Sequence, residues 1–282
     1  MDRVIDVSVV TPSFNMLGYL RRCYASVADQ SGATHEHLVM DGGSTDGTPA
    51  WLTAHPGIAS VVERDAGMYD AVNKGFRRAR GDLISHLNCD EQYLPGALAF
   101  VRDYFSRHPE VDLLFGDALL IRPDGNLIAF RKGFAPLLPV ILSGPLYLFT
   151  AAMFVRRRVI DAGEVYDPSY RNVGDVEFVT RLLRRGYTVK HVRRYLSAFT
   201  MTGANLGTYA DRSLEVHRCR ALAPWWTRRL RPFWRLVGWG VKLTTGAYAQ
   251  GAPIAYDVYA RDDAHARTHF VVQHASWRWR TA

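Results

Sequence analysis

The sequence predicts an α/β protein with a mostly parallel central sheet and helices on both faces. Short β-rich apolar segments alternate with segments of helical periodicity up to about residue 117, and the connections between them are short. Several of the apolar segments end in a polar or glycine-rich turn that leads into a helix, as in βαβ units. At 282 residues with 48% hydrophobic and 22% charged composition, the chain suits one sizeable globular domain plus an extension.

Five strands are expected in this first part, at residues 7–11, 37–40, 60–63, 111–117 and in the apolar run that starts at residue 81. Each is a run of buried-type residues, and the first stops at Pro12. Helices are expected over residues 17–29, from Thr48 and Pro49 onward, and after residues 65–70. An uncharged run at residues 133–155 is interrupted by prolines and a glycine, which favours a buried loop and strand over a membrane span.

The fourth strand ends abruptly in polar and acidic residues, namely Asn88, Asp90 and Glu91. Ligands of open α/β sheets bind outside the carboxyl ends of the strands, so these side chains are expected to face a ligand. Two neighbouring carboxylates repel each other unless a cation or hydrogen-bond donors stand between them. A hard divalent ion that also holds a substrate phosphate fits this position. The alternative is an ordinary solvated acidic turn.

Familiar nucleotide-binding loops are absent. No GxGxxG opens the first helix, and no Walker-type loop occurs. Nucleotide recognition would instead depend on polar strand ends, with Asp41 placed to accept hydrogen bonds from a base or ribose. A turn-capping role is the alternative for this residue.

The net charge of +8, carried mainly by arginine, suits an anionic partner such as nucleotide phosphates, acidic lipid head groups or nucleic acid. Cys23, Cys89 and Cys219 are far apart and lack CxxC spacing, so neither a disulfide framework nor a zinc site is expected. The acidic start of the chain does not resemble a signal peptide. A reducing, cytoplasmic location follows as the expectation.

Six motifs occur in a characteristic order: VTPSFN (10–15), MDGGSTDGT (40–48), ERDAGMYDAVNKG (63–75), LNCDE (87–91) with LPGAL (94–98), GD (116–117) and NVGDVE (172–177). Together they resemble the inverting glycosyltransferases of family 2, which have the GT-A (nucleotide-diphospho-sugar transferase) fold. The bacterial colanic-acid and surface-polysaccharide enzymes are the most similar type. The resemblance covers residues 7 to about 205.

This resemblance implies a nucleotide-diphospho-sugar donor, a divalent metal (Mn²⁺ or Mg²⁺), and an acceptor that is a saccharide or a lipid-linked saccharide. Its donor-side residues map onto Thr11, Pro12, Asp41, Asp65, Lys74 and Asn88. Asp90 is the implied metal ligand, with Glu91 beside it.

Inverting transfer requires a carboxylate that accepts the proton of the attacking hydroxyl, and a metal that stabilises the departing diphosphate. Asp175 matches the family's general-base position, and Glu177 is the reserve candidate. Asp117 is implied to orient the donor sugar or the acceptor. The alternative for Asp175 is a helix N-cap, which contributes about 1 kcal/mol.

The sequence departs from the family pattern in three places. Asn88 stands at the first acidic position of the metal motif, and Glu91 stands where a second aspartate is common. Residues 149–152 lack a histidine that many relatives carry. A non-catalytic or weakly metal-dependent nucleotide-sugar-binding relative is therefore an alternative. A basic nucleic-acid-binding protein would leave the acidic strand ends unexplained, and a sugar nucleotidyltransferase would need a glycine-rich basic loop after the first strand.

The motifs end near residue 204, which divides the chain into a catalytic domain (1–204) and a helical extension (205–282). Residues 224–237 interleave tryptophan with arginine, and Pro232 is expected to begin the second of two short helices. On a helical wheel one half holds Trp225, Trp226, Leu230, Phe233, Trp234 and Val237, and the other holds Arg228, Arg231 and Arg235, with Arg229 as the exception. This pattern fits a helix lying on an anionic membrane, on the cytoplasmic face of the inner membrane. It fits equally an amphipathic helix packed on the catalytic domain or on a second subunit of a homodimer.

Overall fold

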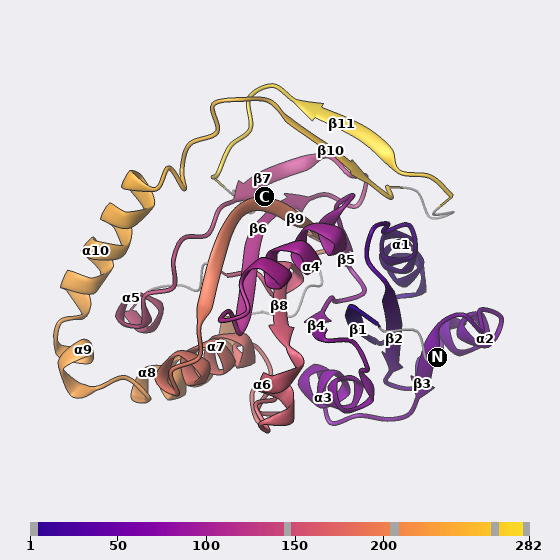
Figure 1. Cartoon of the computed structure of the whole chain (residues 1–282), viewed down its shortest axis with the longest axis horizontal. Coiled ribbons are helices and arrows are strands. Elements are labelled where there is room, and N and C mark those ends of the chain that lie inside the picture. The colour runs from indigo at the N-terminus through magenta and orange to yellow at the C-terminus, as the bar shows by residue number, and fades with distance from the viewer. Residues whose placement is uncertain (1–4, 144–147, 204–208, 261–264, 279–282) are drawn as a thin grey trace.

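The computed structural model describes residues 5–143, 148–203, 209–260 and 265–278 (Figure 1). Four parallel strands form the amino-terminal half of the central sheet, in the order β3-β2-β1-β4. Their bounds are β1 Val7–Ser13, β2 His35–Asp41, β3 Ala59–Val62 and β4 Leu83–His86. The alternating strand and helix segments predicted parallel strands here but did not give their order.

The second half of the sheet mixes strand directions. The order continues from β4 through β8 (Met153–Arg156), β6 (Leu113–Ile121) and β9 (Val189–Thr200) to β5 (Glu91–Tyr93), while β7 (Leu127–Arg131) pairs with β6. Among the described strands of this half, β6 and β9 are the one parallel pair. The predicted α/β class with a mostly parallel central sheet is confirmed for the described residues.

Helices cover both faces of the sheet, and β1 contributes side chains to the hydrophobic core on each face. Val7 and Val9 pack with side chains of α1 (Leu17–Ala28) and α4 (Ala97–Arg107). Val10 points the other way and packs with α3 (Met68–Arg78), α5 (Leu138–Ser143) and α7 (Gly174–Arg184). Successive side chains of a strand face opposite sides, so an unbroken apolar run can serve two helical layers. The shorter elements are α2 (Thr48–Thr53), α6 (Arg157–Asp161) and the 3-10 helix η1 (Thr150–Ala152).

The uncharged run at residues 133–155 forms α5, η1 and the start of β8, except for residues 144–147, which lie outside the described part. Leu142, Ala151 and Phe154 are buried. The predicted buried strand is present as β8, whereas the predicted loop contains the short helices α5 and η1. No helix of the described residues is both long and apolar enough to cross a bilayer.

The carboxy-terminal extension begins with three helices, α8 (Tyr209–Ala221), α9 (Trp225–Arg229) and α10 (Arg231–Thr244). Pro232 lies in the first turn of α10, close to the predicted start. The extension then forms an antiparallel hairpin of β10 (Ile254–Val258) and β11 (Thr268–Val272). The sequence predicted a helical extension and did not include these two strands. Buried and more exposed residues alternate along β10, the period-two pattern of a strand with one covered face.

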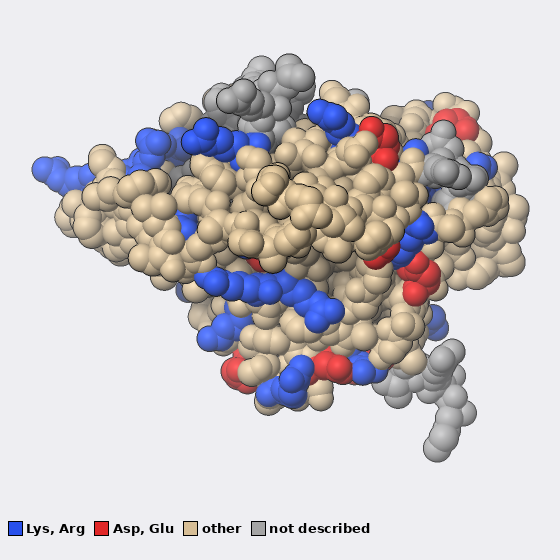
Figure 2. Space-filling view, turned by 90° about the horizontal axis from the view of Figure 1, so that it is seen from above, with Lys and Arg blue, Asp and Glu red and all other residues tan. Residues whose placement is uncertain are grey.

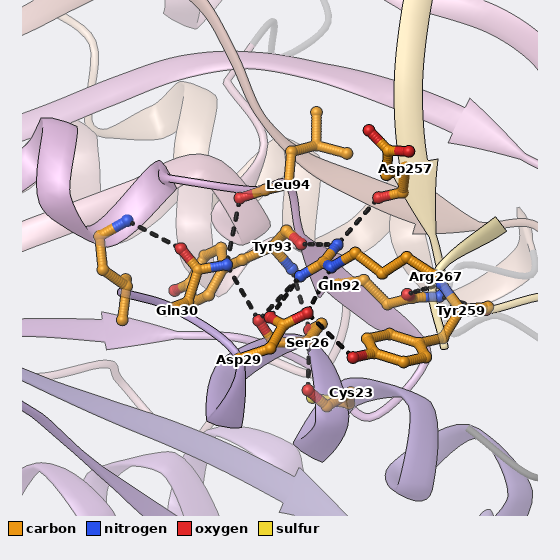
Figure 3. A network of polar contacts seen from close by, with 11 residues as sticks. Cys23, Ser26, Asp29, Gln30, Gln92, Tyr93, Leu94, Asp257, Tyr259 and Arg267 are labelled. Atoms are coloured by element: carbon orange, nitrogen blue, oxygen red, sulfur yellow. Dashed lines mark hydrogen bonds and ion pairs between the residues drawn. The ribbon is translucent and has the colours of Figure 1, made fainter. Parts of the chain in front are cut away.

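Arg267 fastens this hairpin to the start of the chain (Figure 3). Its guanidinium donates to both carboxylate oxygens of Asp29, at 2.6 and 2.7 Å, and to the carbonyl oxygen of Tyr93 at 2.9 Å. The Gln92 amide exchanges two hydrogen bonds with the Tyr259 backbone, at 3.0 and 2.8 Å. We call this set the C-terminal clasp. It holds β5, the strand that directly follows the polar end of β4.

Candidate active site

Three of the polar strand ends meet at one edge of the sheet, because β1, β2 and β4 are adjacent and parallel. Ser13 at the end of β1 pairs with Asp41 at the end of β2, and the Gly42 N–H donates to the Ser13 carbonyl at 2.9 Å. The Leu87 N–H, just past β4, donates to the Val10 carbonyl at 3.0 Å. Residues of three separate motifs are thus neighbours.

The Asp41 carboxylate accepts hydrogen bonds from the loop that directly follows it. Oδ2 accepts hydrogen bonds from the backbone N–H groups of Gly43 (3.1 Å) and Ser44 (2.9 Å), and Oδ1 accepts one from the Ser44 hydroxyl at 2.6 Å. Asp41 is 1% exposed. The turn-capping role is therefore present in the structure. A carboxylate has about four acceptor positions, so three bonds leave room for one further donor from a ligand.

The loops after β1, β2 and β3 converge at Gly42. A Cβ on this glycine would lie 2.7 Å from Oδ2 of Asp65 and 3.4 Å from the ring of Phe14, so both side chains rest against its backbone. Oδ1 of Asp65 accepts a hydrogen bond from the Gly67 N–H at 2.8 Å. Phe14 is 60% exposed although it is a large apolar side chain. An exposed ring beside a bare backbone and a carboxylate is suited to stacking a nucleobase.

Two residues assigned to the donor side have their side chains in the interior. The Thr11 hydroxyl is fully buried and lies 2.8 Å from Nε2 of His37. Pro12 is buried within β1, paired with Met40 of β2. Because β1 continues through the proline instead of stopping there, these residues hold the strand end in place and do not present their side chains to a nucleoside.

Lys74 is engaged by its own neighbourhood. Its ammonium donates to the Arg64 carbonyl at 3.0 Å and forms ion pairs with Glu63 at 3.2 Å and Asp70 at 3.4 Å. Burial would lower the pKa of Lys74, but the bonds to Glu63 and Asp70 outweigh it and raise the pKa. In this structure Lys74 therefore fixes the loop that contains Asp65.

Beyond β4, the Asn88 side chain is held from both sides. His86 Nε2 lies 2.9 Å from its Oδ1, and its Nδ2 donates to Glu91 Oε1 at 3.1 Å. The Asn88 backbone N–H also donates to Glu91 Oε2, at 2.7 Å. Glu91 is 1% exposed. Burial raises the pKa of Glu91, and the nearby charges of Asp90 and Asp175 raise it further.

Glu91 is therefore buried and bonded to Asn88 in the loop after β4. Its carboxylate is not placed to act as a metal ligand. Among the described residues no three His, Cys, Asp or Glu side chains gather as a metal-binding group. Asp90 is half-buried at the polar strand end. Mg²⁺ and similar ions at phosphate-transfer sites are commonly held by one or two carboxylates plus substrate phosphates. The residues present fit a metal held in that way, with Asp90 as the protein's carboxylate.

Asp175 reaches the same region from α7. Its backbone N–H donates to the Tyr69 hydroxyl of α3 at 3.3 Å, and a Cβ on Gly174 would lie 2.6 Å from the Tyr69 ring. Asn73 of α3 exchanges two hydrogen bonds with the backbone of Tyr166, at 2.7 and 3.0 Å. Burial raises the pKa of Tyr69, and so does the charge of Asp175. Because Asp175 also acts on Glu91, the carboxylates of α7 and of the β4 end share one electrostatic environment.

The residues just before Asp175 are held by α8. The Glu215 carboxylate accepts the backbone N–H groups of Arg171, Asn172 and Val173, at 2.8, 2.8 and 3.0 Å. Glu215 is 8% exposed. The Asp175 carboxylate in turn accepts the Val176 N–H at 2.8 Å, within the first turn of α7. A residue of the extension thus sets the position of the candidate base, and no motif marked it in the sequence.

The two other acidic candidates are occupied elsewhere. Asp117 is 2% exposed, and its Oδ1 lies 2.8 Å from Nε2 of His191 and accepts the Gly133 N–H at 2.9 Å. Its carboxylate fixes an irregular stretch of the β6–β9 pair and is not presented to a sugar. Glu177 forms a two-pronged ion pair with Arg181, at 2.8 and 3.0 Å. Because both of its carboxylate oxygens are bonded to Arg181, Glu177 is a poor candidate for the general base.

A curled, mostly parallel sheet, with polar strand ends at one edge and a helix-borne carboxylate beside them, defines a transferase of the GT-A fold. The glycosyl transferase family 2 model matches residues 8–161, so the chain belongs to that family. It is 27% identical over 212 residues to a PGL/p-HBAD biosynthesis glycosyltransferase of Mycobacterium tuberculosis, covering 73% of this chain and 80% of that protein. It is 32% identical over 182 residues to an uncharacterized glycosyltransferase of the same organism, covering 62% and 68% of the two chains.

Solved structures share the fold. S. aureus TarS 1–349 in complex with UDP-GlcNAc aligns with a TM-score of 0.63 at 17% identity, over 77% of this chain and 66% of that one. Mannosyltransferase PcManGT from Pyrobaculum calidifontis, in complex with GDP-Man and Mn²⁺, aligns with a TM-score of 0.56 at 16% identity, over 88% and 77%. The family match establishes the chain as a family 2 glycosyl transferase, and the solved structures show that it shares their fold.

Proposed function

We propose that this protein transfers a sugar from a nucleotide-diphospho-sugar to an acceptor hydroxyl with inversion, and that Asp175 is the general base. The observation that carries the proposal is a chain of contacts that joins the start of α7 to the end of β4. The Asp175 N–H donates to the Tyr69 hydroxyl at 3.3 Å, and the ring centroids of Tyr69 and Tyr166 are 4.9 Å apart. The Tyr166 ring lies 5.7 Å from that of His86, and His86 Nε2 lies 2.9 Å from Asn88 Oδ1. A base and a diphosphate-binding carboxylate close to one another are what a single displacement requires.

The donor side is formed by the loops after β1 to β4. The exposed ring of Phe14 stacks on the nucleobase, and the lack of a side chain at Gly42 leaves room for Phe14 and Asp65 beside it. Asp41 and Asp65 accept hydrogen bonds from the nucleoside. A divalent ion, when bound with the donor, neutralises charge on the departing diphosphate. Asp90 would hold that ion, and Asn88 orients the loop through its bonds to His86 and Glu91.

The acceptor side is the start of α7. The Val176 N–H fixes the orientation of the Asp175 carboxylate, and the Tyr69 hydroxyl fixes its backbone. The carboxylate accepts the acceptor proton as the hydroxyl oxygen bonds to the anomeric carbon and the bond to the diphosphate breaks. We assign the donor contacts to residues 1–204 and the support of the acceptor side to the extension at 205–282.

The named relatives support this class of reaction. TarS is seen with UDP-GlcNAc and with UDP, and PcManGT with GDP-Man and Mn²⁺, which favours a nucleotide-diphospho-sugar donor used with a divalent metal. The mycobacterial relative's role in PGL/p-HBAD biosynthesis and the similarity to an Escherichia coli chondroitin synthase favour a saccharide or lipid-linked acceptor.

A screen of nucleotide-sugars for thermal stabilisation, with and without Mn²⁺ or Mg²⁺, identifies the donor. Transfer is then measured with that donor, and the anomeric configuration of the product is read by NMR. Asp175→Asn is expected to keep donor binding and to lower kcat by roughly 10²- to 10⁴-fold. Asp90→Asn is expected to weaken the metal-dependent part of the stabilisation. Retention of configuration, or normal turnover by Asp175→Asn, would contradict the mechanism. Donor binding without hydrolysis or transfer would indicate the non-catalytic alternative.

A further inference from the structure

The outward face of α9 and α10 is apolar. Large side chains point into solvent along it, with Trp225 at 71%, Leu236 at 63% and Trp239 at 55% exposure. The full set is Trp225, Trp226, Leu230, Phe233, Leu236, Trp239 and Leu243. We call it the outer apolar face. At 100° per residue, Leu236, Trp239 and Leu243 fall within about 60° of one another on α10.

This face is distinct from the side of α10 that packs on the protein. Val237 and Val241 pack on the core, and Gly238 lies so close to α5 that an added Cβ would meet Val140 at 2.7 Å. The helical wheel of residues 224–237 placed Trp225, Trp226 and Trp234 on one half, opposite most of the arginines. In the structure Trp234 is half-buried, whereas Trp239 and Leu236 face outward. The packing requirement of α10 is already met by its inner face.

Only cations accompany the outer apolar face. The sequence has no acidic residue between Glu215 and Asp257, but it has Arg218, Arg220, Arg228, Arg229, Arg231, Arg235 and Lys242. Burial lowers the pKa of Arg220, and the neighbouring charges of Arg231 and Arg235 lower it further, so these cations lie near one another. Figure 2 shows basic and uncharged residues, and no acidic ones, at the left-hand end where α10 lies.

We propose that the outer apolar face docks on an anionic lipid bilayer, with α10 lying in the plane of the membrane. Tryptophan is favoured at the boundary between lipid and water, and lysine and arginine reach from there to acidic head groups. Apolar area and basic charge both add to such binding. At 14 residues α10 is about 21 Å long, which suits a helix on the surface.

A second copy of the chain is a poorer partner for this face. A two-fold interface brings the same patch of both copies together. In such a dimer the cations Arg228, Arg235 and Lys242 of one subunit would face the same cations of the other subunit. The segment contains no carboxylate that could neutralise them. Like charges facing each other across an interface oppose association. An anionic surface meets the same cations with attraction.

Docking would orient the enzyme. α10 packs on α5, α5 packs on α7, and α7 begins at Gly174 and Asp175. The bilayer would therefore lie on the side of the molecule that supports the candidate base. The docking itself goes beyond the proposed function and does not depend on it, since it concerns a surface that contains none of the donor-site residues.

Flotation of the full chain with vesicles tests the proposal. One set of vesicles contains phosphatidylcholine with about 30% phosphatidylglycerol, and the other phosphatidylcholine alone. We expect the protein to float with the anionic vesicles at low salt and to be released as salt rises. The double variant Leu236→Glu with Trp239→Glu is expected to lower the bound fraction at least about tenfold. Val271→Glu changes another exposed apolar residue, 51% exposed on β11, and is the matched control.

The thermal unfolding midpoint, measured for each variant, reports whether the fold is intact. Failure of the unaltered chain to float with anionic vesicles would overturn the proposal. Equal loss of binding in Val271→Glu and in the double variant would do the same. Sedimentation that shows a dimer dissociated by Leu236→Glu would assign the face to a second copy instead.

Discussion

Replacing Glu215 with glutamine is expected to slow sugar transfer without weakening donor binding. The Glu215 carboxylate accepts three backbone N–H groups from residues 171–173, two on Oε2 and one on Oε1. Glutamine has the same shape but only one acceptor oxygen, and its amide group would face an N–H donor on the other side. At least one hydrogen bond to a charged acceptor is lost, which corresponds to about 1.5–3 kcal/mol.

The loss falls on the segment that leads directly into Gly174 and Asp175. A displacement of about 1 Å in a catalytic group can lower a rate roughly 100-fold, because the reacting atoms must be held in position. The donor contacts that we propose come from loops after other strands. We therefore expect kcat to fall by about 10- to 100-fold while KM for the donor stays within about twofold.

The assay combines steady-state transfer kinetics with urea unfolding. Glu110→Gln, a change at an exposed carboxylate on a loop, serves as the matched control. Glu215→Asp keeps the charge and is expected to recover part of the rate. The reasoning is refuted if Glu215→Gln lowers the free energy of unfolding and leaves kcat unchanged. It is also refuted if donor affinity falls by the same factor as kcat.

Three further predictions concern packing, pH and the clasp. Gly174→Ala would place a Cβ 2.6 Å from the buried Tyr69 ring, and we expect it to lower the free energy of unfolding by about 1–3 kcal/mol, measured by urea titration. Burial lowers the pKa of His37 in the folded protein to about 3 from its ordinary 6.5. Above pH 6.5 the imidazole is neutral in both the folded and the unfolded state, and the stability of the fold is unaffected. As pH falls from 6.5 toward 3, the unfolded state takes up a proton that the folded state does not, and the free energy of unfolding decreases. At pH 5 the loss is about 2 kcal/mol, and His37→Gln should remove that part of the pH dependence; an unchanged stability–pH curve in His37→Gln would contradict this. Arg267→Ala breaks the pair with Asp29 and should lower stability by about 2–3 kcal/mol and speed proteolysis of the hairpin, whereas an unchanged digestion pattern would show that the clasp is not needed.

The first half of the fold could be predicted because each buried parallel strand is a continuous apolar run that ends in a distinctive turn. Residues 37–40 and the turn at Asp41 illustrate this, since the run and its end are both visible locally. The antiparallel second half was harder. β5 has three residues and pairs with β9, which lies far along the chain, so no local pattern announces it.

The site shows the same division. Which residues stand at strand ends is a local property, and the structure has Asp41 at the end of β2 and Asn88 just beyond β4. Whether a side chain is turned inward depends on partners distant in sequence. Asp117 is turned toward His191, for example, at an irregularity in strand register that the sequence does not show. The role of Glu215 could not be predicted from the sequence, because its three partners are backbone N–H groups and any residue type provides those.

The bond between Arg267 and Asp29 joins residues 238 positions apart. During synthesis, Asp29 and β5 emerge from the ribosome long before Arg267, the residue just before β11. Until then the Tyr93 carbonyl and the Gln92 amide at that edge have only water as a partner in place of Arg267 and Tyr259. Complete folding of this segment is therefore expected to wait until residue 267 has emerged, and a nascent chain stalled before that residue should resist protease less than one stalled well beyond it.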